Sequence, residues 1–370
     1  MKLVSLGEVG FQVRDQAVLN KTRTYELWSI PACEGGVPEV VAGQVIGSSK
    51  FSLQLNDVLV SKINPRINRV WIVSRDFSNH EQIGSTEWIV YRPDSEKILP
   101  RFAMHFFRSP EVRSLMIENT TGATGSHTRA RVDVLLGHKI PLPSLEKQRE
   151  IVEKLDSAFA EIDLLEENLR SSEIKTNELL QSLLSSAFSS DKAQIDFTKV
   201  FTVIPDSKSK IKSSSYLESG KYSVVDQGKE LVAGYTDTPP TVEKKSLPVI
   251  VFGDHTRAVK YIDFPFTAGA DGTQILKPSA LTDPKYGFYL VLHAVGQIPS
   301  KGYARHFGEL KKMQFQLPSL PEQRKIVEKL DSVFAQIELL KAQIKIEQDH
   351  ATALRQSLLR AAFNQEKEVA

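Results

Sequence analysis

The segment LPSLEKQREIVEKLDSAFAEIDLLEENL at 142–169 returns as LPSLPEQRKIVEKLDSVFAQIELLKAQI at 317–344, a shift of 175 residues with 18 of 28 positions identical. The same shift matches QSLLSSAF at 181–188 with QSLLRAAF at 356–363, where six of eight positions are identical. When residues 128–141, just before the first block, are compared with 303–316, only Leu135 and Leu310 are identical. The repeat therefore has sharp edges and indicates two related segments, each of which follows a different module.

Both repeated segments are predicted to be long helices. No Pro occurs from 144 to 204 and no Gly from 138 to 219, and the second copy has neither after Pro321. Ser319 and Glu322 form a capping-box start, and Ser144 is the equivalent start of the first copy. Roughly 45 residues at about 1.5 Å each predict a rod of about 68 Å.

Apolar residues in both copies follow the three-and-four spacing of a coiled-coil seam. Extra apolar residues at Ile151, Ala158 and Leu165 predict that this face touches more than one neighbour. The alternative is a bundle of ordinary core helices. The residues expected to serve helix–helix contact and partner docking are Val152, Leu155, Phe159, Ile162, Val327, Leu330, Phe334 and Ile337.

The two preceding segments are domain-sized and combine short strand signals with a few helices, so we predict two mixed α/β (α+β) heads joined by two long helices. Strand signals include VLVSKI at 58–63 and LPVIVF at 247–252, and helices are expected at 101–118 and 284–296. The first helix leads to the second head and its equivalent leads back, so the helices are expected to be antiparallel, with a pseudo-two-fold axis between unlike heads. The expected boundaries are 1–141, 142–189, 190–316 and 317–370.

Composition excludes several classes of protein. With 41% hydrophobic and 25% charged residues the chain is neither collagenous nor disordered. No window approaches 18 uncharged apolar residues, and MKLVSLGEVGFQVRD has acids too early for a secretory signal, so we expect no membrane association. The single Cys33 predicts neither a disulfide nor a zinc site and is typical of a reducing cytoplasm.

The net charge of +2 averages over unlike parts. The formal charge is +3 over 1–141, −5 over 142–189, +4 over 190–316 and zero over 317–370. Basic patches on the heads include SKINPRINRVWIVSR at 61–75 and the Gly-rich loop GATGSHTRAR at 122–131. Such loops suit phosphate contacts and base reading, although any one patch can be a solvated surface without function.

Catalytic and metal-binding motifs are missing from the sequence. There is no GxxxxGK[ST] loop, no GxSxG, no HExxH and no paired metal-ligand spacing. Asn64-Pro65-Arg66 lacks the second proline and the aromatic residue of the NPP-aromatic loop of adenine methyltransferases. The sequence therefore predicts a binding protein that is not itself an enzyme and holds no metal.

The plan of two unlike heads and two repeated helices resembles the specificity subunit of type I restriction–modification enzymes. The resemblance spans nearly the whole chain. One departure is Asn56, where the family more often has Gly before Asp57. The matching strings are IPLPSLEKQREIVEKLD, QLPSLPEQRKIVEKLD, LNDVLVSKINPR, TTGATGSHTRAR, GKYSVVDQG, AGYTD, VIVFGDHTRAVKYID, FTAGADG and GYARHF.

The resemblance implies a non-catalytic subunit that binds double-stranded DNA. In that family each head is a target recognition domain that reads one half of a bipartite sequence, and the helices fix the spacing. Two modification (methyltransferase) subunits, which hold S-adenosylmethionine, dock on the helices, and restriction (translocase/nuclease) subunits use ATP and magnesium. This chain is then expected to bind no cofactor itself. A rod of about 68 Å is commensurate with about two DNA turns of roughly 34–36 Å.

The candidate DNA contacts are polar and basic residues of the head loops. Asp254 and Asp271 are alternatives that brace these loops instead of binding. The candidates are Lys62, Arg66, Arg69, Ser126, Arg129 and Arg131 in the first head, and Gln227, Lys229, His255, Thr256, Arg257, Lys260, Tyr303, Arg305 and His306 in the second.

Two alternatives remain open at the level of sequence. The first is a coiled-coil adaptor whose heads bind protein partners, which a weak dependence of affinity on salt would reveal. The second keeps DNA reading but places the subunit in a modification-only system without a nuclease.

Overall fold

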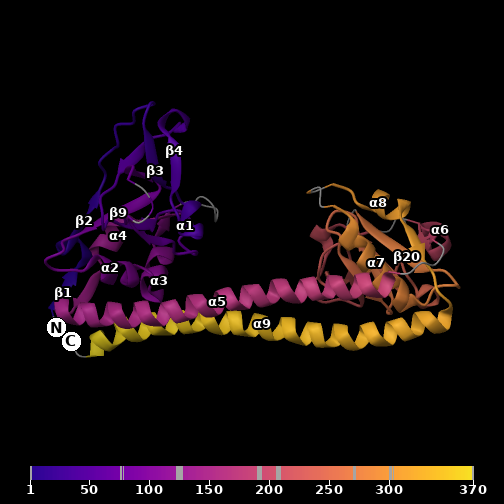
Figure 1. Cartoon of the computed structure of the whole chain (residues 1–370). Helices are drawn as coiled ribbons and strands as arrows, with labels where there is room; N and C mark the ends of the chain where they lie inside the picture. The colour runs from indigo at the N-terminus through magenta and orange to yellow at the C-terminus, as the bar shows by residue number, and fades with distance from the viewer. Residues whose placement is uncertain are drawn as a thin grey trace. The chain divides into compact units, whose positions relative to one another are not determined.

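The chain divides into two compact units that are described separately. Unit 1 comprises Met1–Leu169 and Ile346–Ala370, and unit 2 comprises Arg170–Lys345. Each unit has a head and a part of each long helix, α5 (Leu145–Phe188) and α9 (Leu320–Glu368) (Figure 1). The computed structural model describes residues 2–368 except 76, 78, 122–127, 190–193, 206–209, 270–271, 300–301 and 303.

Among its described residues, the head of unit 1 contains two four-stranded sheets. The first, β2-β9-β6-β7, is antiparallel, and the second, β4-β3-β8-β5, contains the parallel pair β3 and β8. β1 and β12 form a separate antiparallel pair, as do β10 and β11. The strands are β1 Lys2–Ser5, β2 Gly10–Val13, β3 Thr24–Trp28, β4 Glu39–Ala42, β5 Lys50–Ser52, β6 Val58–Ser61, β7 Val70–Ile72, β8 Glu81–Ser85, β9 Trp88–Pro93, β10 Thr120–Thr121, β11 Arg129–Ala130 and β12 Lys139–Leu142; the helices are α1 Ala32–Gly35, α2 Pro100–Phe107, α3 Pro110–Glu118 and α4 Val132–Gly137.

The head of unit 2 contains, among its described residues, a four-stranded and a three-stranded sheet. The first, β14-β20-β17-β18, is antiparallel, and the second, β16-β15-β19, contains the parallel pair β15 and β19. β13 and β21 pair separately. The strands are β13 Gln194–Asp196, β14 Phe201–Ile204, β15 Tyr222–Val225, β16 Gly234–Thr236, β17 Val249–Gly253, β18 Val259–Ile262, β19 Phe266–Ala268, β20 Thr273–Pro278 and β21 Gln314–Gln316; the helices are α6 Phe197–Val200, α7 Pro284–Gln297 and α8 Phe307–Lys312.

The two heads share one topology although their sequences differ. The antiparallel sheets have the same strand order, the second sheets share a parallel pair, and in both units a Pro-initiated helix follows the central sheet. The predicted unlikeness of the heads holds for their sequences, while their folds are alike. A buried strand needs only apolar side chains at the right period, so different sequences can form the same sheet.

Mixed α/β heads and long helices are confirmed. The expected helix at 101–118 is broken into α2 and α3, because Pro110 has no backbone N–H to continue the hydrogen-bond ladder, and the Oγ of Ser109 accepts from Val112 N to start the new helix. Asn56 has a φ of 70°, a conformation that Asn tolerates better than most residues, so it can stand where glycine is usual.

The starts of α5 and α9 carry the predicted serine caps. At α9, the carboxylate of Glu322 accepts from the backbone N–H and the hydroxyl of Ser319, at 3.0 and 2.9 Å. At α5, the Oγ of Ser144 accepts from Lys147 N at 3.3 Å. These bonds satisfy donors that a helix start otherwise leaves unpaired.

α5 and α9 run antiparallel within each unit (Figure 1). In unit 1, Arg355 near the end of α9 donates to Asp163 of α5 at 2.6 Å. In unit 2, Ala187 in the last turn of α5 and Ile326 in the second turn of α9 line the same pocket. The seam residues are buried and join the apolar core of their own head, except Phe334, which is partly buried. No described helix is long and apolar enough to cross a membrane.

A buried glutamine of the repeat ties each head to its helix in the same way. Gln148 Oε1 accepts from Leu99 N at 2.8 Å, and its Nε2 donates to the carbonyls of Lys97 and Pro143. Gln323 repeats the pattern with Asp283 N at 2.7 Å and the carbonyls of Leu281 and Pro318. Leu99 and Asp283 are the N-cap residues of α2 and α7, so both glutamines fix the start of the helix that packs under the sheet.

A second duplicated contact joins the same helices. In unit 1, Asp156 pairs with Arg101 at 2.9 Å and with His105 Nε2 at 2.7 Å. In unit 2, the equivalent Asp331 pairs with Lys285 at 2.6 Å and accepts from the Tyr289 hydroxyl at 2.6 Å. His105 and Tyr289 occupy the same place in α2 and α7, so only unit 1 has a group there that titrates near neutral pH.

The stability of unit 1 is therefore expected to fall as the pH is lowered from 7 to 5. Burial, opposed by Asp156, lowers the pKa of His105 below its usual value of 6.5. The unfolded chain then binds a proton that the folded chain does not, so stability drops below pH 6.5 by at most about 1.4 kcal/mol per pH unit. His105→Tyr, which copies unit 2, should remove this dependence. Hydrogen exchange of α2 measured against pH tests this, and an unchanged pH profile in the variant would contradict it.

Candidate nucleic-acid interface

In unit 1, two of the basic segments predicted from sequence lie side by side. Residues 62–69 form the loop after β6 and pair with β11: Ala130 N donates to Lys62 O at 2.9 Å, and Asn64 N donates to Thr128 O at 3.2 Å. Both segments adjoin buried strands, which fixes their backbones. The structure thus brings the candidates around Lys62 and Arg129 into one loop cluster.

The side chains of this cluster differ in how free they are. Arg66 is exposed. Arg129 is also exposed but makes a two-pronged ion pair with Glu87, which lowers the pKa of that carboxyl. Arg131 pairs with Asp133 on the surface. Exposed ion pairs are worth little, so a phosphate can replace the carboxylate of either pair at small cost.

The side chains of two other candidates of unit 1 make contacts inside the head. Lys62 donates to Thr86 O, and burial lowers the pKa of its ammonium group. Arg69 is mostly buried and pairs with Glu34. These contacts give both side chains a bracing role in the loop. Ser126 lies outside the described residues.

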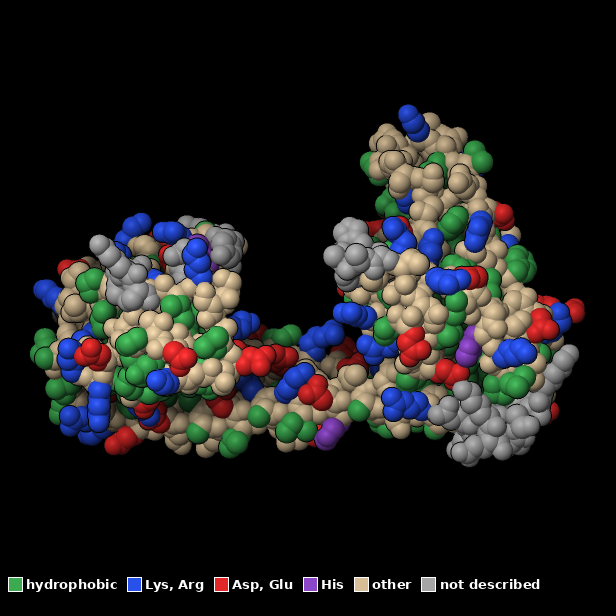
Figure 2. Space-filling view, turned by 180° about the vertical axis from the view of Figure 1, so that it is seen from behind, with side chains coloured by type: hydrophobic (Ala, Val, Ile, Leu, Met, Phe, Trp, Pro, Cys, Tyr) green, Lys and Arg blue, Asp and Glu red, His purple; other side chains and the backbone are tan. Residues whose placement is uncertain are grey.

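In unit 2, three segments far apart in the sequence meet at one end of the head. Gln227, after β15, accepts through Oε1 from His255 N at 3.2 Å and through its carbonyl from the Thr256 hydroxyl. Arg257 has a left-handed backbone with a φ of 60°, and its Nη1 donates to Ile298 O at 2.8 Å. Figure 2 shows Lys, Arg and His side chains together at the end of this head that lies away from the helices.

Asp254 is the residue that holds the third segment. Its side chain is buried, and Oδ1 accepts from the backbone N–H groups of His306 and Phe307, both at 2.8 Å. Oδ2 lies 4.0 Å from Nε of Arg305, whose side chain is 78% exposed. Asp254 therefore has the bracing role that the sequence offered as an alternative, and it positions Arg305 at the surface. Asp271 lies outside the described residues.

The remaining candidates of unit 2 fall into a buried group and an exposed group. Lys260 is buried, its Nζ donates to Asp226 O at 2.9 Å, and burial lowers its pKa. His306 is buried, and its backbone and ring both contact Asp254. These two act from inside the loops. Lys229 and Thr256 are exposed, and Tyr303 lies outside the described residues.

Sequence reasoning missed Glu34, Glu87 and Asp226, the partners that decide which cations are free. A carboxylate distant in sequence gives no local signal of such a pairing. Gln148 and Gln323 had a signal, because they are an identical polar pair in the two copies of the repeat.

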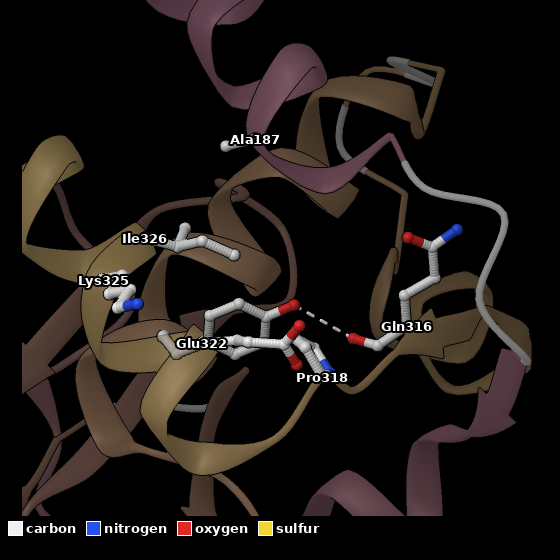
Figure 3. A pocket seen from close by; sticks show the side chains of 7 residues that line it. Ala187, Gln316, Pro318, Glu322, Lys325 and Ile326 are labelled. Carbon is white, nitrogen blue, oxygen red and sulfur yellow. Dashed lines mark hydrogen bonds between the residues drawn. The ribbon is translucent and has the colours of Figure 1, made fainter.

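The described residues show no arrangement typical of catalysis or metal binding. No group of three or more His, Cys, Asp or Glu among them could hold a metal ion. Burial raises the pKa of the Cys33 thiol, which makes it less reactive. Unit 2 has a pocket of about 280 Å³, in which the Tyr286 hydroxyl donates to Gln316 O at 3.0 Å. Glu322 and Lys325 are among the side chains that line it (Figure 3). Burial raises the pKa of Tyr286, which keeps this phenol protonated.

Comparisons with known proteins agree on one kind of relative. The chain is 29% identical over 141 residues to the type I restriction enzyme StySPI specificity subunit of Salmonella potsdam, and 26% identical over 139 residues to the EcoBI specificity subunit of Escherichia coli. Each match covers 38% of this chain but only 30% and 28% of the relative, so the chain matches less than a third of the length of these proteins.

Solved structures extend the likeness of fold to nearly the whole chain. A chain from a study of complex assembly and conformational transition in a type I R-M system has a TM-score of 0.74 at 22% identity, covering 98% of this chain and 97% of that one. The crystal structure of the HsdS subunit from Thermoanaerobacter tengcongensis has a TM-score of 0.51 at 21% identity, covering 99% and 97%.

The fold and its loop clusters define a tandem protein, in which two heads of one topology each present their own set of polar loops. The family model for the type I restriction modification DNA specificity domain matches residues 2–175 and 191–348. The chain belongs to this family and carries its domain twice.

Proposed function

We propose that the chain is the specificity subunit of a type I restriction–modification complex, a non-catalytic protein that acts in the cytoplasm on double-stranded DNA. Each head reads one half of a bipartite, asymmetric target. The observation that carries the proposal is that one topology occurs twice with different loop clusters. Equal scaffolds explain two equivalent ways of docking on DNA, and unlike loops explain two different half-sites.

Docking of two modification subunits is supported by exposed apolar residues that recur in the repeat. Leu164 and its equivalent Leu339 are 60% and 73% exposed, and the neighbouring Leu165 and Leu340 are 40% and 47% exposed. Both positions are leucine in each copy of the repeat although the seam beside them is buried. Exposed leucines at matching places suit two copies of one partner. These leucines, more than the buried seam residues, are then the docking surface.

In this proposal the cofactors of the complex are bound by the partner subunits and not by this chain. S-adenosylmethionine belongs with the two modification subunits, and ATP and magnesium with the restriction subunits. The part of the chain that the structure describes offers side chains for loop bracing and surface contact, which is the chemistry of a DNA reader.

Duplex DNA binding by the full chain is expected to fall steeply with salt. If about five of the exposed cations contact phosphates, the slope of log affinity against log salt is about −4 to −5, or a loss of several hundredfold between 50 and 200 mM. The double variant Arg66→Ala and Arg305→Ala should reduce the slope by about 2. Arg360→Ala, an exposed residue of α9, is the control that should leave it unchanged. Absent or salt-independent DNA binding would favour the adaptor with protein partners.

A further inference from the structure

A pocket of about 460 Å³ in unit 1 has a basic lining. It lies between the head and the helices, with α1 and the loop before β7 on one side, the end of α2 and the start of α3 above, and facing parts of α5 and α9 below. Among the described lining residues, four are arginines: Arg69, Arg108, Arg113 and Arg355. Figure 2 shows Lys and Arg side chains gathered where this head meets the helices.

The carboxylates of the lining neutralise only part of this charge. Arg69 pairs with Glu34, and Arg355 pairs with Asp163 at 2.6 Å. Among the described residues, neither Arg108 nor Arg113 has a carboxylate within ion-pair distance. Arg108 donates to Val70 O at 3.0 Å, and burial lowers the pKa of its guanidinium. The described lining thus has four arginines against the two carboxylates of Glu34 and Asp163, an excess of positive charge.

The second copy of the scaffold shows that the fold does not require these cations. The position equivalent to Arg355 in the repeat is Leu180. Arg108 is the ninth residue from the proline that begins α2, and the ninth residue from the proline that begins α7 is Leu292. Both leucines pack in the apolar core of unit 2. A partly buried arginine costs more than a packed leucine unless a counter-charge is present.

We propose that this pocket of unit 1 binds a phosphate group. Arg108 and Arg113 would hold it, with Arg355 at the rim. Planar guanidinium groups match phosphate oxygens in pairs, and two that approach from α2 and α3 can contact different oxygens of one tetrahedral group. The volume also admits the group that carries the phosphate. That carrier is either a small phosphorylated ligand or the backbone of bound DNA.

Inorganic phosphate titrated into the full chain by calorimetry is the first test. Arg113→Gln, at an exposed position whose side chain makes no ion pair with another described residue, is expected to weaken binding about tenfold, because it removes a charge-assisted hydrogen bond. Arg108→Leu, which copies unit 2, should have at least this effect. Arg360→Gln makes the same charge change on exposed α9 and should bind like the parent. If Arg108→Leu fails to fold, Arg113→Gln carries the test alone.

Duplex DNA binding by the same variants identifies the source of the phosphate. Weaker phosphate binding with unchanged DNA affinity assigns a small phosphorylated ligand. A drop in DNA affinity, with the salt slope reduced by about 0.9 for each arginine, assigns a DNA phosphodiester. The proposal is overturned if both variants bind phosphate and DNA like the parent protein. The phosphate titration does not depend on DNA reading, so its failure is distinct from failure of the proposed function.

Discussion

Gln148→Ala is expected to lower the free energy of unfolding of unit 1 by about 3–5 kcal/mol. The side chain is fully buried and bonds the backbone of Leu99, Lys97 and Pro143. Alanine leaves these buried groups without partners, and each costs about 1–3 kcal/mol when unsatisfied, in addition to the cavity. Gln323→Ala should cost unit 2 a similar amount, because its contacts are the same.

Denaturant unfolding, monitored through the hydrogen exchange of α2 and α7, measures the stability of the two units separately. Each glutamine variant should lose protection in its own unit first. Gln336→Ala, at an exposed position of α9, is the matched control and should change stability little. Losses below about 1 kcal/mol at both buried positions would show that these glutamines are not the links between head and helix.

Asp254→Ala is expected to weaken reading by the head of unit 2 strongly while leaving the other head active. Without the carboxylate, Phe307 N loses its acceptor and Arg305 loses its charge partner, so only the contacts of His306 with the Asp254 carbonyl still hold the segment that carries Arg305. Loss of the contacts made by this segment should weaken binding of the corresponding half-site about a hundredfold, or about 3 kcal/mol.

Two variants separate bracing from charge at this position. Asp254→Asn keeps an oxygen that can accept from His306 and Phe307, so it should retain most of the affinity. Asp263→Ala removes a carboxylate from an exposed site of the same head and should have little effect. Equal loss at the Asn variant would show that the charge, and not the bracing, matters. Loss at both half-sites would show that the two heads do not read DNA separately.

The long helices could be predicted from sequence because their signals are local. A run without Pro or Gly, a serine cap and a regular apolar period lie within the segment itself. The strands around Val58 and Val249 were likewise visible as short apolar runs. The strand order and register of the sheets were not visible, because sheet pairing joins backbones that are far apart and allows different side chains.

The loop clusters were predictable in composition but not in detail. Basic residues in Gly-rich loops indicated where binding surfaces lie. Which cation is free depends on distant partners: Arg69 is matched by Glu34, Lys260 is enclosed by the loop of Asp226, and Arg66 stays exposed. Arg257 and its left-handed backbone also depend on a turn that composition does not reveal.

Selection of bound sequences from a pool of random DNA duplexes by the full chain tests the central claim most directly. Two different sequence blocks separated by an unselected gap of fixed length are the predicted result, and Asp254→Ala should lose one block and keep the other. A single contiguous block, or a symmetric pair of identical blocks, would contradict the account in which each head reads its own half-site.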